Sequence, residues 1–316
     1  MPRNPLEYNA TLVGRVDLAE GLAIFRVRAD GDPFSTFTPG QYITLGANHP
    51  EKGPVQRAYS IASPPQALPN YLEFFIRHVE KPASENPLTH LLFGLHDGDR
   101  LHVGKKIVGK FTVEQEAGAG DPRLRVCVAA GTGLAPFTSM VFDAINRGES
   151  GERFLVLSGA RFPREIGYRA ELEAALNGGP FPRRYFPTIS RDPGAEPWPA
   201  HYGRGRVETF FDPGKREALE AEAGLGPGGL NPANAVVFIC GLTGTISSTI
   251  LRLLDRGFVP GETKLRRAFG IPEGTPSSLF FEQYDSDPVL DLKDEALMAQ
   301  CRGKLAAAGV ALEVPA

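Results

Sequence analysis

The chain has 316 residues, enough for two domains that each bury a hydrophobic core. A hydrophobic content of 42%, 22% charged residues and a net charge of −3 are ordinary for a globular protein and argue against nucleic acid or anionic membrane as partners. The sequence has no signal-peptide-like segment and no apolar run near the ~20 residues that span a bilayer, so we expect a cytoplasmic protein. We also expect a monomer or weak dimer.

The cysteine and histidine content excludes several kinds of site. Cys127, Cys240 and Cys301 are odd in number and far apart, which argues against a disulfide framework. Three cysteines cannot supply the four thiolates of an iron–sulfur cluster, and the histidines lack metal-ligand spacing. We therefore expect no metal site, and any single electrons must pass to a separate partner.

Short strands with proline and glycine between them dominate residues 8–115. The clearest strands are 22–28, 41–45 and 71–79, and residues 88–93 are the one expected helix in this half. Closely spaced strands of this kind predict a small antiparallel barrel or sandwich. The small-residue stretch 117–122 then marks a linker, so we place the domain boundary at 118/119.

The pattern changes after the linker to buried strands that alternate with helices. This alternation predicts a doubly wound α/β domain. A long loop rich in proline and glycine interrupts it at 193–205, and Leu297, Cys301 and Leu305 predict a docked helix within a C-terminal extension from about residue 286. The expected strands are 124–130, 154–158, 184–189 and 235–240, and the helices are 135–146, 165–176, 215–223 and 246–256.

The segment Arg57-Ala58-Tyr59-Ser60 is the first candidate for ligand binding. Alternation on a strand puts Arg57 and Tyr59 on one side and Ser60 on the other. A flavin needs an aromatic face, a donor near N5 and cations for its pyrophosphate, and these three residues supply them. On spacing alone, a half-buried strand explains the segment equally well.

Later residues strengthen the flavin interpretation. Pro87-Leu88-Thr89 opens the lone helix, whose N-terminus suits a phosphate, and Phe75 and Arg77 lie on the strand before it. The segment 104–111 contains two glycines, which let backbone come close to a ligand.

Gly131-Thr132-Gly133 follows a buried strand and precedes a helix with Ala135 and Pro136 in its first turn. A glycine-rich phosphate loop requires this context. The motif lacks the full G-x-G-x-x-G pattern, so a plain tight turn is the competing explanation.

Arginines follow the next strands along the chain. Arg161 comes after the second strand, Ser190 and Arg191 after the third, and Arg206 after the long loop. Ligands of parallel α/β sheets bind at the carboxyl ends of strands, so these cations predict an extra phosphate, such as the 2′-phosphate of NADP. Singly, each arginine is explained equally well as a solvated surface charge.

Cys240-Gly241 ends the fourth strand. A small buried residue before a turn is the ordinary explanation, because free cysteine is commonly buried. The functional interpretation is a thiol beside a nicotinamide, where a small, weakly polar group leaves room for a flavin.

Together these motifs resemble the ferredoxin–NADP reductase family, most closely its bacterial ferredoxin/flavodoxin–NADP reductases, over about residues 8–285. The resemblance implies a six-stranded antiparallel flavin-binding barrel followed by an NADP-binding doubly wound domain. It implies that Arg57, Ala58, Tyr59, Ser60, Pro87, Leu88 and Thr89 hold FAD, that the glycine motif holds the NADP pyrophosphate, and that Arg161, Ser190, Arg191 and Arg206 read its 2′-phosphate.

The same resemblance assigns roles at the reaction centre. Glu282-Gln283-Tyr284 is similar to the family's terminal Glu-x-aromatic, in which the aromatic stacks on the flavin. The implied catalytic set is Ser60, Cys240, Glu282 and Tyr284, which assist hydride transfer between NADPH and flavin N5, with ferredoxin or flavodoxin as the partner. One departure is that about thirty residues follow Tyr284. Either they run over the surface and leave Tyr284 in place, or they reshape the site.

Two alternatives remain open from the sequence. The chain is also compatible with the NAD(P)H-dependent reductase component of an oxygenase, which uses the same half-reaction with another acceptor. A non-catalytic flavin- or nucleotide-binding module is the alternative from another class, and a flavin spectrum that NADPH bleaches discriminates against it.

Overall fold

The computed structural model describes residues 4–82, 86–149, 153–177 and 183–313. Its contacts divide the chain into two compact units. The first contains residues 1–112 and 134–149, and the second contains 113–133 and 150–316. Residues 134–149, which follow the glycine motif, therefore make most of their contacts with the N-terminal half.

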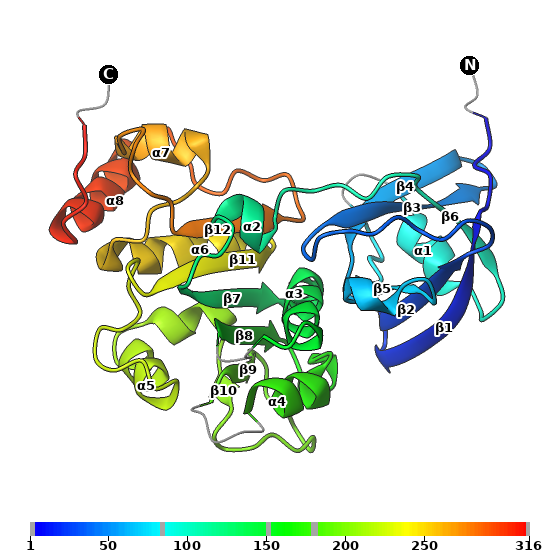
Figure 1. Cartoon of the computed structure of the whole chain (residues 1–316), viewed down its shortest axis with the longest axis horizontal. Helices are drawn as coiled ribbons and strands as arrows, with labels where there is room; N and C mark the ends of the chain where they lie inside the picture. The colour runs from blue at the N-terminus through cyan, green and yellow to red at the C-terminus, as the bar shows by residue number, and fades with distance from the viewer. Residues whose placement is uncertain (1–3, 83–85, 150–152, 178–182, 314–316) are drawn as a thin grey trace. The chain divides into compact units, whose positions relative to one another are not determined.

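The first unit is built on a six-stranded antiparallel sheet, as predicted, with strand order β4-β3-β6-β1-β2-β5 (Figure 1). Alternate positions of the strands point into one core, which includes Leu12, Phe25, Ile43 and Phe74. The predicted helix α1 (Leu88–Phe93) adds Leu88 and Leu92 to this core. The strands are β1 (Ala10–Ala19), β2 (Leu22–Ala29), β3 (Tyr42–His49), β4 (Gly53–Ser60), β5 (Leu72–Arg77) and β6 (Arg100–Val103).

Helix α3 (Ala135–Asn146) belongs to this first unit and is fastened to it by side-chain hydrogen bonds. Thr138 Oγ1 donates to the carbonyl of Ala62 (3.0 Å) and Ser139 Oγ to that of Ser63 (2.8 Å). Both hydroxyls are fully buried, so their removal would leave the two carbonyls without these partners. The segment just after the Arg57–Ser60 motif is thereby fixed in position.

The second unit contains a parallel six-stranded sheet of order β10-β9-β8-β7-β11-β12 (Figure 1). Strands β7, β8 and β11 are nearly continuous apolar runs because both faces of a parallel sheet are covered. The strands are β7 (Leu124–Ala130), β8 (Phe154–Ala160), β9 (Tyr185–Ile189), β10 (Gly203–Arg204), β11 (Ala235–Gly241) and β12 (Leu279–Gln283).

One face of this sheet carries a hydrophobic core. Val126, Leu155 and Val237 pack there with side chains from α5 (Lys215–Glu222) and α6 (Thr243–Leu253). Helix α4 (Arg169–Asn177) contacts β9. The doubly wound α/β architecture predicted for this half is therefore confirmed.

Several elements differ from the sequence expectations. The helix expected from residue 165 begins at Arg169, because Tyr168 adopts a positive φ of 55° while its ring is buried. Only a single 3-10 turn, Pro163–Glu165, precedes this break. Helix α2 (Val113–Glu116), helix α7 (Thr263–Phe269) and the strand β12 were not anticipated.

The predicted C-terminal helix is α8 (Glu295–Ala307), in which Met298, Cys301 and Leu305 are buried. It packs on α7 and on the turn Leu254–Arg256 that ends α6. Lys304 Nζ also donates to the carbonyl of Leu251 (2.6 Å) near that end of α6. The start of α6 follows the carboxyl end of β11, so the tail lies at the opposite end of this helix from the candidate nucleotide residues.

Candidate functional site

The parallel sheet brings the candidate nucleotide residues to one edge. In the strand register Ala129 pairs with Cys240, Cys240 with Glu282, and Ala160 with Ile189. The residues that follow these strands therefore emerge side by side at the carboxyl edge. They include Gly131, Arg161, Ser190 and Tyr284. This edge is where ligands of such sheets bind.

The glycine motif is shaped by a close approach to β11. A Cβ added at Gly133 would lie 2.1 Å from the Cys240 carbonyl oxygen, so only glycine fits there. At Gly131, φ is +56° and no described atom lies within 4 Å of an added Cβ. Close backbone packing on one side and open space on the other suit a loop that receives a phosphate. Ala135 and Pro136 bury their side chains, so only their backbone is available to a ligand.

The predicted phosphate-reading arginines have different local partners. Arg161 pairs with Glu165 (2.6 Å) and Arg206 with Glu208 (2.6 Å), and each carboxylate is only 4% exposed. Hydrogen bonding to Glu165 raises the pKa of Arg161 further, so it stays cationic. Both arginine side chains remain more than half exposed, so they can contact an anion while the carboxylates fix their direction.

The backbone of Arg191 lies beside that of Arg161. Arg191 N–H donates to the Arg161 carbonyl (3.0 Å), and Ser190 N–H donates to that of Ala160 (3.0 Å). Gly205 N–H bonds the carbonyl of Ile189, which brings Arg206 next to the same strand end. Within the described chain, the Arg191 side chain has no hydrogen-bond or ion-pair partner. It is the arginine of this set that is freest to bind a phosphate.

Cys240 is completely buried, so its thiol does not line an open surface. Burial and the neighbouring Glu282 carboxylate raise the pKa of the Cys240 thiol well above its usual value, and the thiol stays protonated. Tyr284 hydrogen-bonds to this thiol while its own side chain remains 39% exposed. The predicted group Cys240, Glu282 and Tyr284 is thus assembled at one point of the edge.

A hydrogen-bond cluster that the sequence did not reveal holds the chain just after Tyr284. The Asp285 carboxylate accepts from the Thr243 backbone N–H (3.0 Å) and from the Thr243 hydroxyl. Gln283 Nε2 donates to Asp285 (2.6 Å) and to the carbonyl of Asp287 (2.6 Å). Burial alone would raise the pKa of Asp285, but these bonds outweigh it and lower the pKa, so Asp285 is ionised at the start of α6.

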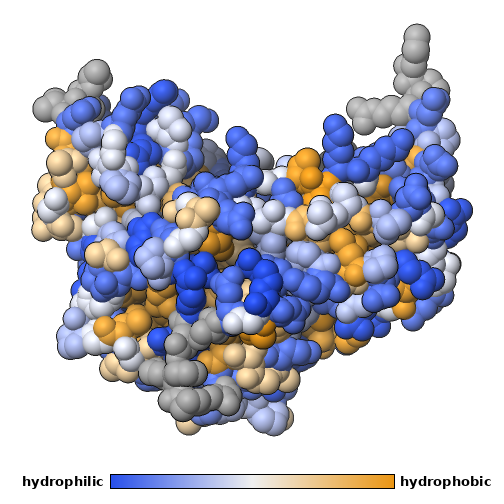
Figure 2. All heavy atoms as spheres, viewed as in Figure 1, coloured by the Kyte–Doolittle hydropathy of each residue, from blue (hydrophilic) through white to orange (hydrophobic). Residues whose placement is uncertain are grey.

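Apolar surface is also found at this edge. In the described part of the chain, Leu242 (60%) and Tyr284 (39%) are among the few large hydrophobic side chains that stay exposed. The Tyr284 N–H donates to the carbonyl of Gly241, the residue before Leu242, so Leu242 and Tyr284 lie near each other. Figure 2 shows a surface that elsewhere mixes hydrophilic and hydrophobic residues in small areas. An exposed aromatic beside polar groups suits a planar ring ligand.

In the first unit, the candidate flavin residues lie on β4 and have unequal burial. Arg57 and Ala58 are exposed, Tyr59 is half-buried, and Ser60 is buried. The Tyr59 hydroxyl is shielded from solvent but has no hydrogen-bond partner among the described residues. Burial raises the pKa of Tyr59 to about 12. A buried hydroxyl without a partner fits a site that a bound polar group completes.

The remaining flavin candidates are largely part of the fold. Thr89 Oγ1 accepts from the Val79 N–H (3.1 Å), which fixes α1 to the end of β5, and Leu88 is fully buried. Phe75 is also buried, whereas Arg77 at the end of β5 and Pro87 before α1 are partly exposed. The Leu88 side chain is therefore not available to a phosphate at this helix, which would meet the backbone there.

Metal sites and membrane-spanning helices are both absent from the described residues. They include no group of three or more histidine, cysteine or acidic side chains that could hold a metal ion. None of the helices in this part of the chain is long and apolar enough to cross a membrane.

Known proteins resemble this chain in sequence and in fold. The family described as the oxidoreductase NAD-binding domain matches residues 127–249. Ferredoxin–NADP reductase B of Sorangium cellulosum is 36% identical over 73% of this chain and 83% of that protein. The chain belongs to the ferredoxin–NADP reductase family. A second member, from Azotobacter vinelandii, is 28% identical over 78% of this chain and 92% of its own.

A solved structure of the same family shares the fold. It is a ferredoxin NADP⁺ reductase from Neisseria gonorrhoeae with bound FAD and NADP. The TM-score is 0.66 at 20% identity, over 89% of this chain and 99% of that one. The resemblance inferred from the motifs is therefore confirmed at the level of family and fold.

Proposed function

We propose that this chain is an FAD-containing oxidoreductase that takes electrons from NADPH and exchanges them singly with ferredoxin or flavodoxin. Family membership supports the oxidoreductase activity and both cofactors. The observation that carries the proposal furthest is the carboxyl edge of the parallel sheet. There the Gly131–Gly133 loop, three arginines and the Cys240/Glu282/Tyr284 group meet.

The residues of this chain fit both cofactors. For NADP, the loop at Gly131 offers open space over bare backbone, and Arg191 offers a cation without a partner in the described chain. For the flavin, exposed Arg57 and the unpartnered Tyr59 hydroxyl lie on one strand. The cofactors supply the chemistry, which is acceptance of a hydride from NADPH and release of its electrons one at a time.

The protein supplies position and protonation. Tyr284 presents an exposed ring, and its hydroxyl is fixed by the Cys240 thiol. Glu282 supplies the carboxylate beside this pair, and Ser60 provides a hydroxyl at the end of β4. In this proposal residues 1–118 form the flavin domain, residues 119–316 the nucleotide domain, and residues from about 286 an extension. Holding two reactants in contact can lower the activation free energy of the reaction by several kcal/mol, up to roughly 7–11.

Anaerobic stopped-flow reduction with NADPH and NADH in parallel tests the proposal. The purified protein should be yellow, and NADPH should bleach it faster than NADH does. A colourless protein after reconstitution with FAD would refute the flavin site. A strong preference for NADH would refute the roles of Arg161, Ser190, Arg191 and Arg206.

The electron acceptor requires a separate assay. The reduced protein should pass electrons to ferredoxin or flavodoxin in a cytochrome c coupled assay. Turnover only with an oxygenase component, and none with either small carrier, would assign the chain to the oxygenase reductases instead.

A further inference from the structure

The backbone of Arg206 is fixed by its neighbours at the carboxyl edge of the parallel sheet. Its carbonyl accepts hydrogen bonds from the backbone N–H of Thr209 (3.0 Å) and from the Thr209 hydroxyl (2.7 Å). The next residue, Val207, packs against bare backbone near the end of β8, because a Cβ added at Gly159 would lie 2.8 Å from the Val207 Cβ. The position of the Arg206 guanidinium therefore depends on what holds its side chain.

A buried carboxylate holds this side chain at Nε. Arg206 Nε donates to Glu208 Oε1 (2.6 Å), and the Glu208 side chain is only 4% exposed against 62% for Arg206. Within the described chain, Nη1 and Nη2 of Arg206 have no hydrogen-bond or ion-pair partner. A guanidinium carries four of its five N–H donors on these two nitrogens, so most of its donors stay available to an anion.

The guanidinium of Arg206 lies beside the start of α6. A Cβ added at Gly244, in the first turn of this helix, would lie 3.5 Å from Arg206 Nη2. The N-terminal end of a helix carries partial positive charge and disfavours a nearby cation. An exposed arginine without a partner would therefore turn away from α6 into solvent. The bond to Glu208 keeps the terminal nitrogens of Arg206 at the carboxyl edge, where α6 follows β11.

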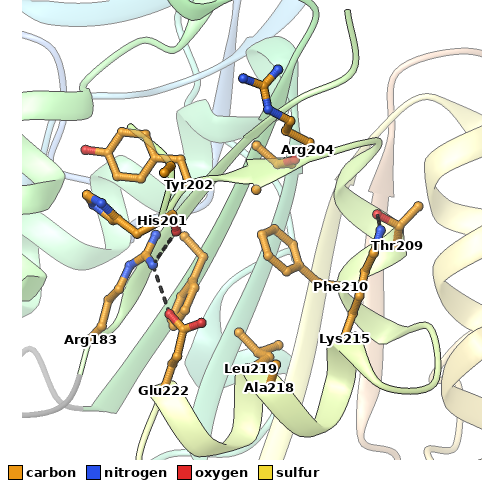
Figure 3. A pocket seen from close by; sticks show the side chains of 14 residues that line it. Arg183, His201, Tyr202, Arg204, Thr209, Phe210, Lys215, Ala218, Leu219 and Glu222 are labelled. Atoms are coloured by element: carbon orange, nitrogen blue, oxygen red, sulfur yellow. Dashed lines mark hydrogen bonds and ion pairs between the residues drawn. The ribbon is translucent and has the colours of Figure 1, made fainter. Parts of the chain in front are cut away.

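Stability alone gives a poor account of Glu208. Its Oε2 is buried without a hydrogen-bond partner in the part of the chain that the structure describes, and an unpartnered charged oxygen costs folding free energy. Buried ion pairs are in general weak contributors to stability. The pair Arg183–Glu222, in the pocket of Figure 3, has the opposite arrangement, with a mostly buried arginine and a carboxylate more than half exposed. At Glu208 the acid is buried and the cation is presented to solvent.

We propose that Glu208 is a positioning residue that holds Arg206 ready for the 2′-phosphate of NADPH, an inference that rests on the nucleotide site proposed above. Two effects of the carboxylate oppose each other. Its charge repels a phosphate, but it contacts Nε rather than Nη1 or Nη2, and solvent and salt screen the repulsion at this exposed edge. Its hydrogen bond fixes the direction of a charge-assisted contact, which is among the stronger interactions available to a phosphate. Positioning therefore outweighs repulsion, and Glu208 raises the preference for NADPH over NADH.

Adenosine 2′,5′-bisphosphate and adenosine 5′-monophosphate differ only in the 2′-phosphate, so their affinities isolate the proposed contact. Calorimetric titration of the FAD-loaded protein should show tighter binding of the bisphosphate. Glu208→Ala should weaken bisphosphate binding about tenfold and leave monophosphate binding unchanged, as for the loss of one charge-assisted contact. Glu208→Gln, whose amide oxygen can still accept from Arg206 Nε, should weaken bisphosphate binding only about threefold, and it supplies the measurement if the alanine variant does not fold.

A double-mutant cycle separates positioning from a purely structural role. In an Arg206→Ala background, Glu208→Ala should not weaken bisphosphate binding further, because no guanidinium remains to be held. Glu222→Gln is the matched control, since it removes the carboxylate charge of the pair with the opposite arrangement. This control should leave the affinities for both nucleotides unchanged.

The unmodified protein decides the nucleotide site, and the variants decide the role of Glu208. If the unmodified protein binds both nucleotides equally, the 2′-phosphate site is refuted and the role of Glu208 with it. If it prefers the bisphosphate but both Glu208 variants bind that nucleotide as tightly or more tightly, only the role of Glu208 is overturned. Equal losses for both nucleotides, or the same loss in the Arg206→Ala background, would show a structural role and would also overturn the proposal.

Discussion

The contact between Gly133 and β11 gives the sharpest prediction. An alanine Cβ at position 133 would lie 2.1 Å from the Cys240 carbonyl oxygen and 2.6 Å from the carbonyl carbon. Ordinary contacts of this kind lie beyond about 3 Å, so one of two backbones must shift by about 1 Å. Neither can do so by a rotamer change, because both groups are main chain. Overpacking of this kind costs about 1–3 kcal/mol.

The loss of stability should be visible in thermal unfolding. For units of about 150–250 residues, 1 kcal/mol corresponds to about 2–4 °C in Tm, so Gly133→Ala should lower Tm by about 2–12 °C. The matched control is Gly274→Ala, also in the second unit. At position 274 no described atom lies within 4 Å of an added Cβ and φ is ordinary. This control should not lower Tm, and a slight rise is consistent with it because alanine restricts the unfolded chain more than glycine does.

The same displacement should weaken the binding of NADPH, because the Gly131–Gly133 loop moves away from Cys240. We expect a higher Km for NADPH in Gly133→Ala and an unchanged one in Gly274→Ala. Differential scanning calorimetry measures Tm, and steady-state kinetics measures the Km for NADPH. If Gly133→Ala unfolds with the wild-type Tm and binds NADPH as tightly, the glycine is not required by packing and the interpretation of the loop is wrong.

Four further predictions concern single residues. Arg191→Ala should raise the Km for NADPH about 10- to 100-fold and leave that for NADH unchanged, as expected for one charge-assisted hydrogen bond; equal effects on both would remove Arg191 from the 2′-phosphate site. Ser60→Ala should retain FAD but slow flavin reduction at least about tenfold in stopped flow, and unchanged rates would refute a role near N5. Asp285→Asn should lower stability by about 1–3 kcal/mol at neutral pH. Since the pKa of Asp285 is lowered in the folded state, its contribution is present above the unfolded pKa near 3.8 and is lost on further acidification, so wild-type and variant melting temperatures should converge there. Gly303→Ala, on the exposed face of α8 with no described atom near an added Cβ, should stabilise the protein by about 0.5–1 kcal/mol, and a lower Tm would contradict this.

Sequence periodicity predicted the regular elements well where local pattern and tertiary environment agree. The apolar runs at 124–130 and 235–240 have the length of a buried strand and are too short for a typical helix, and both strands were confirmed. The start of α4 was wrong because the positive φ of Tyr168 depends on a buried ring, which a helical pattern does not encode. The strand β12 was missed because its pairing with β11 is non-local.

In the candidate site, too, local sequence patterns predicted some features and missed those that depend on tertiary contacts. Motif order placed Gly131, Arg161 and Cys240 at strand ends, and the register confirmed that these ends share one edge. The sequence did not reveal that Cys240 is fully buried or that Glu165 and Glu208 pair with the arginines. Such partners come from side-chain directions within turns, and no spacing rule supplies them.

The residues after Tyr284 raised the question of whether a long tail disturbs the site. The hydrogen bonds around Asp285 separate Tyr284 from the tail that follows it. Thr243 and Gln283 bind Asp285 immediately after Tyr284, and the Tyr284 N–H bonds Gly241, so the aromatic is held from both sides. Beyond this point the chain packs at the opposite end of α6. Tyr284 is therefore held in place although it does not lie at the end of the chain. Helix α8 contributes to the core of the second unit and does not reach the carboxyl edge.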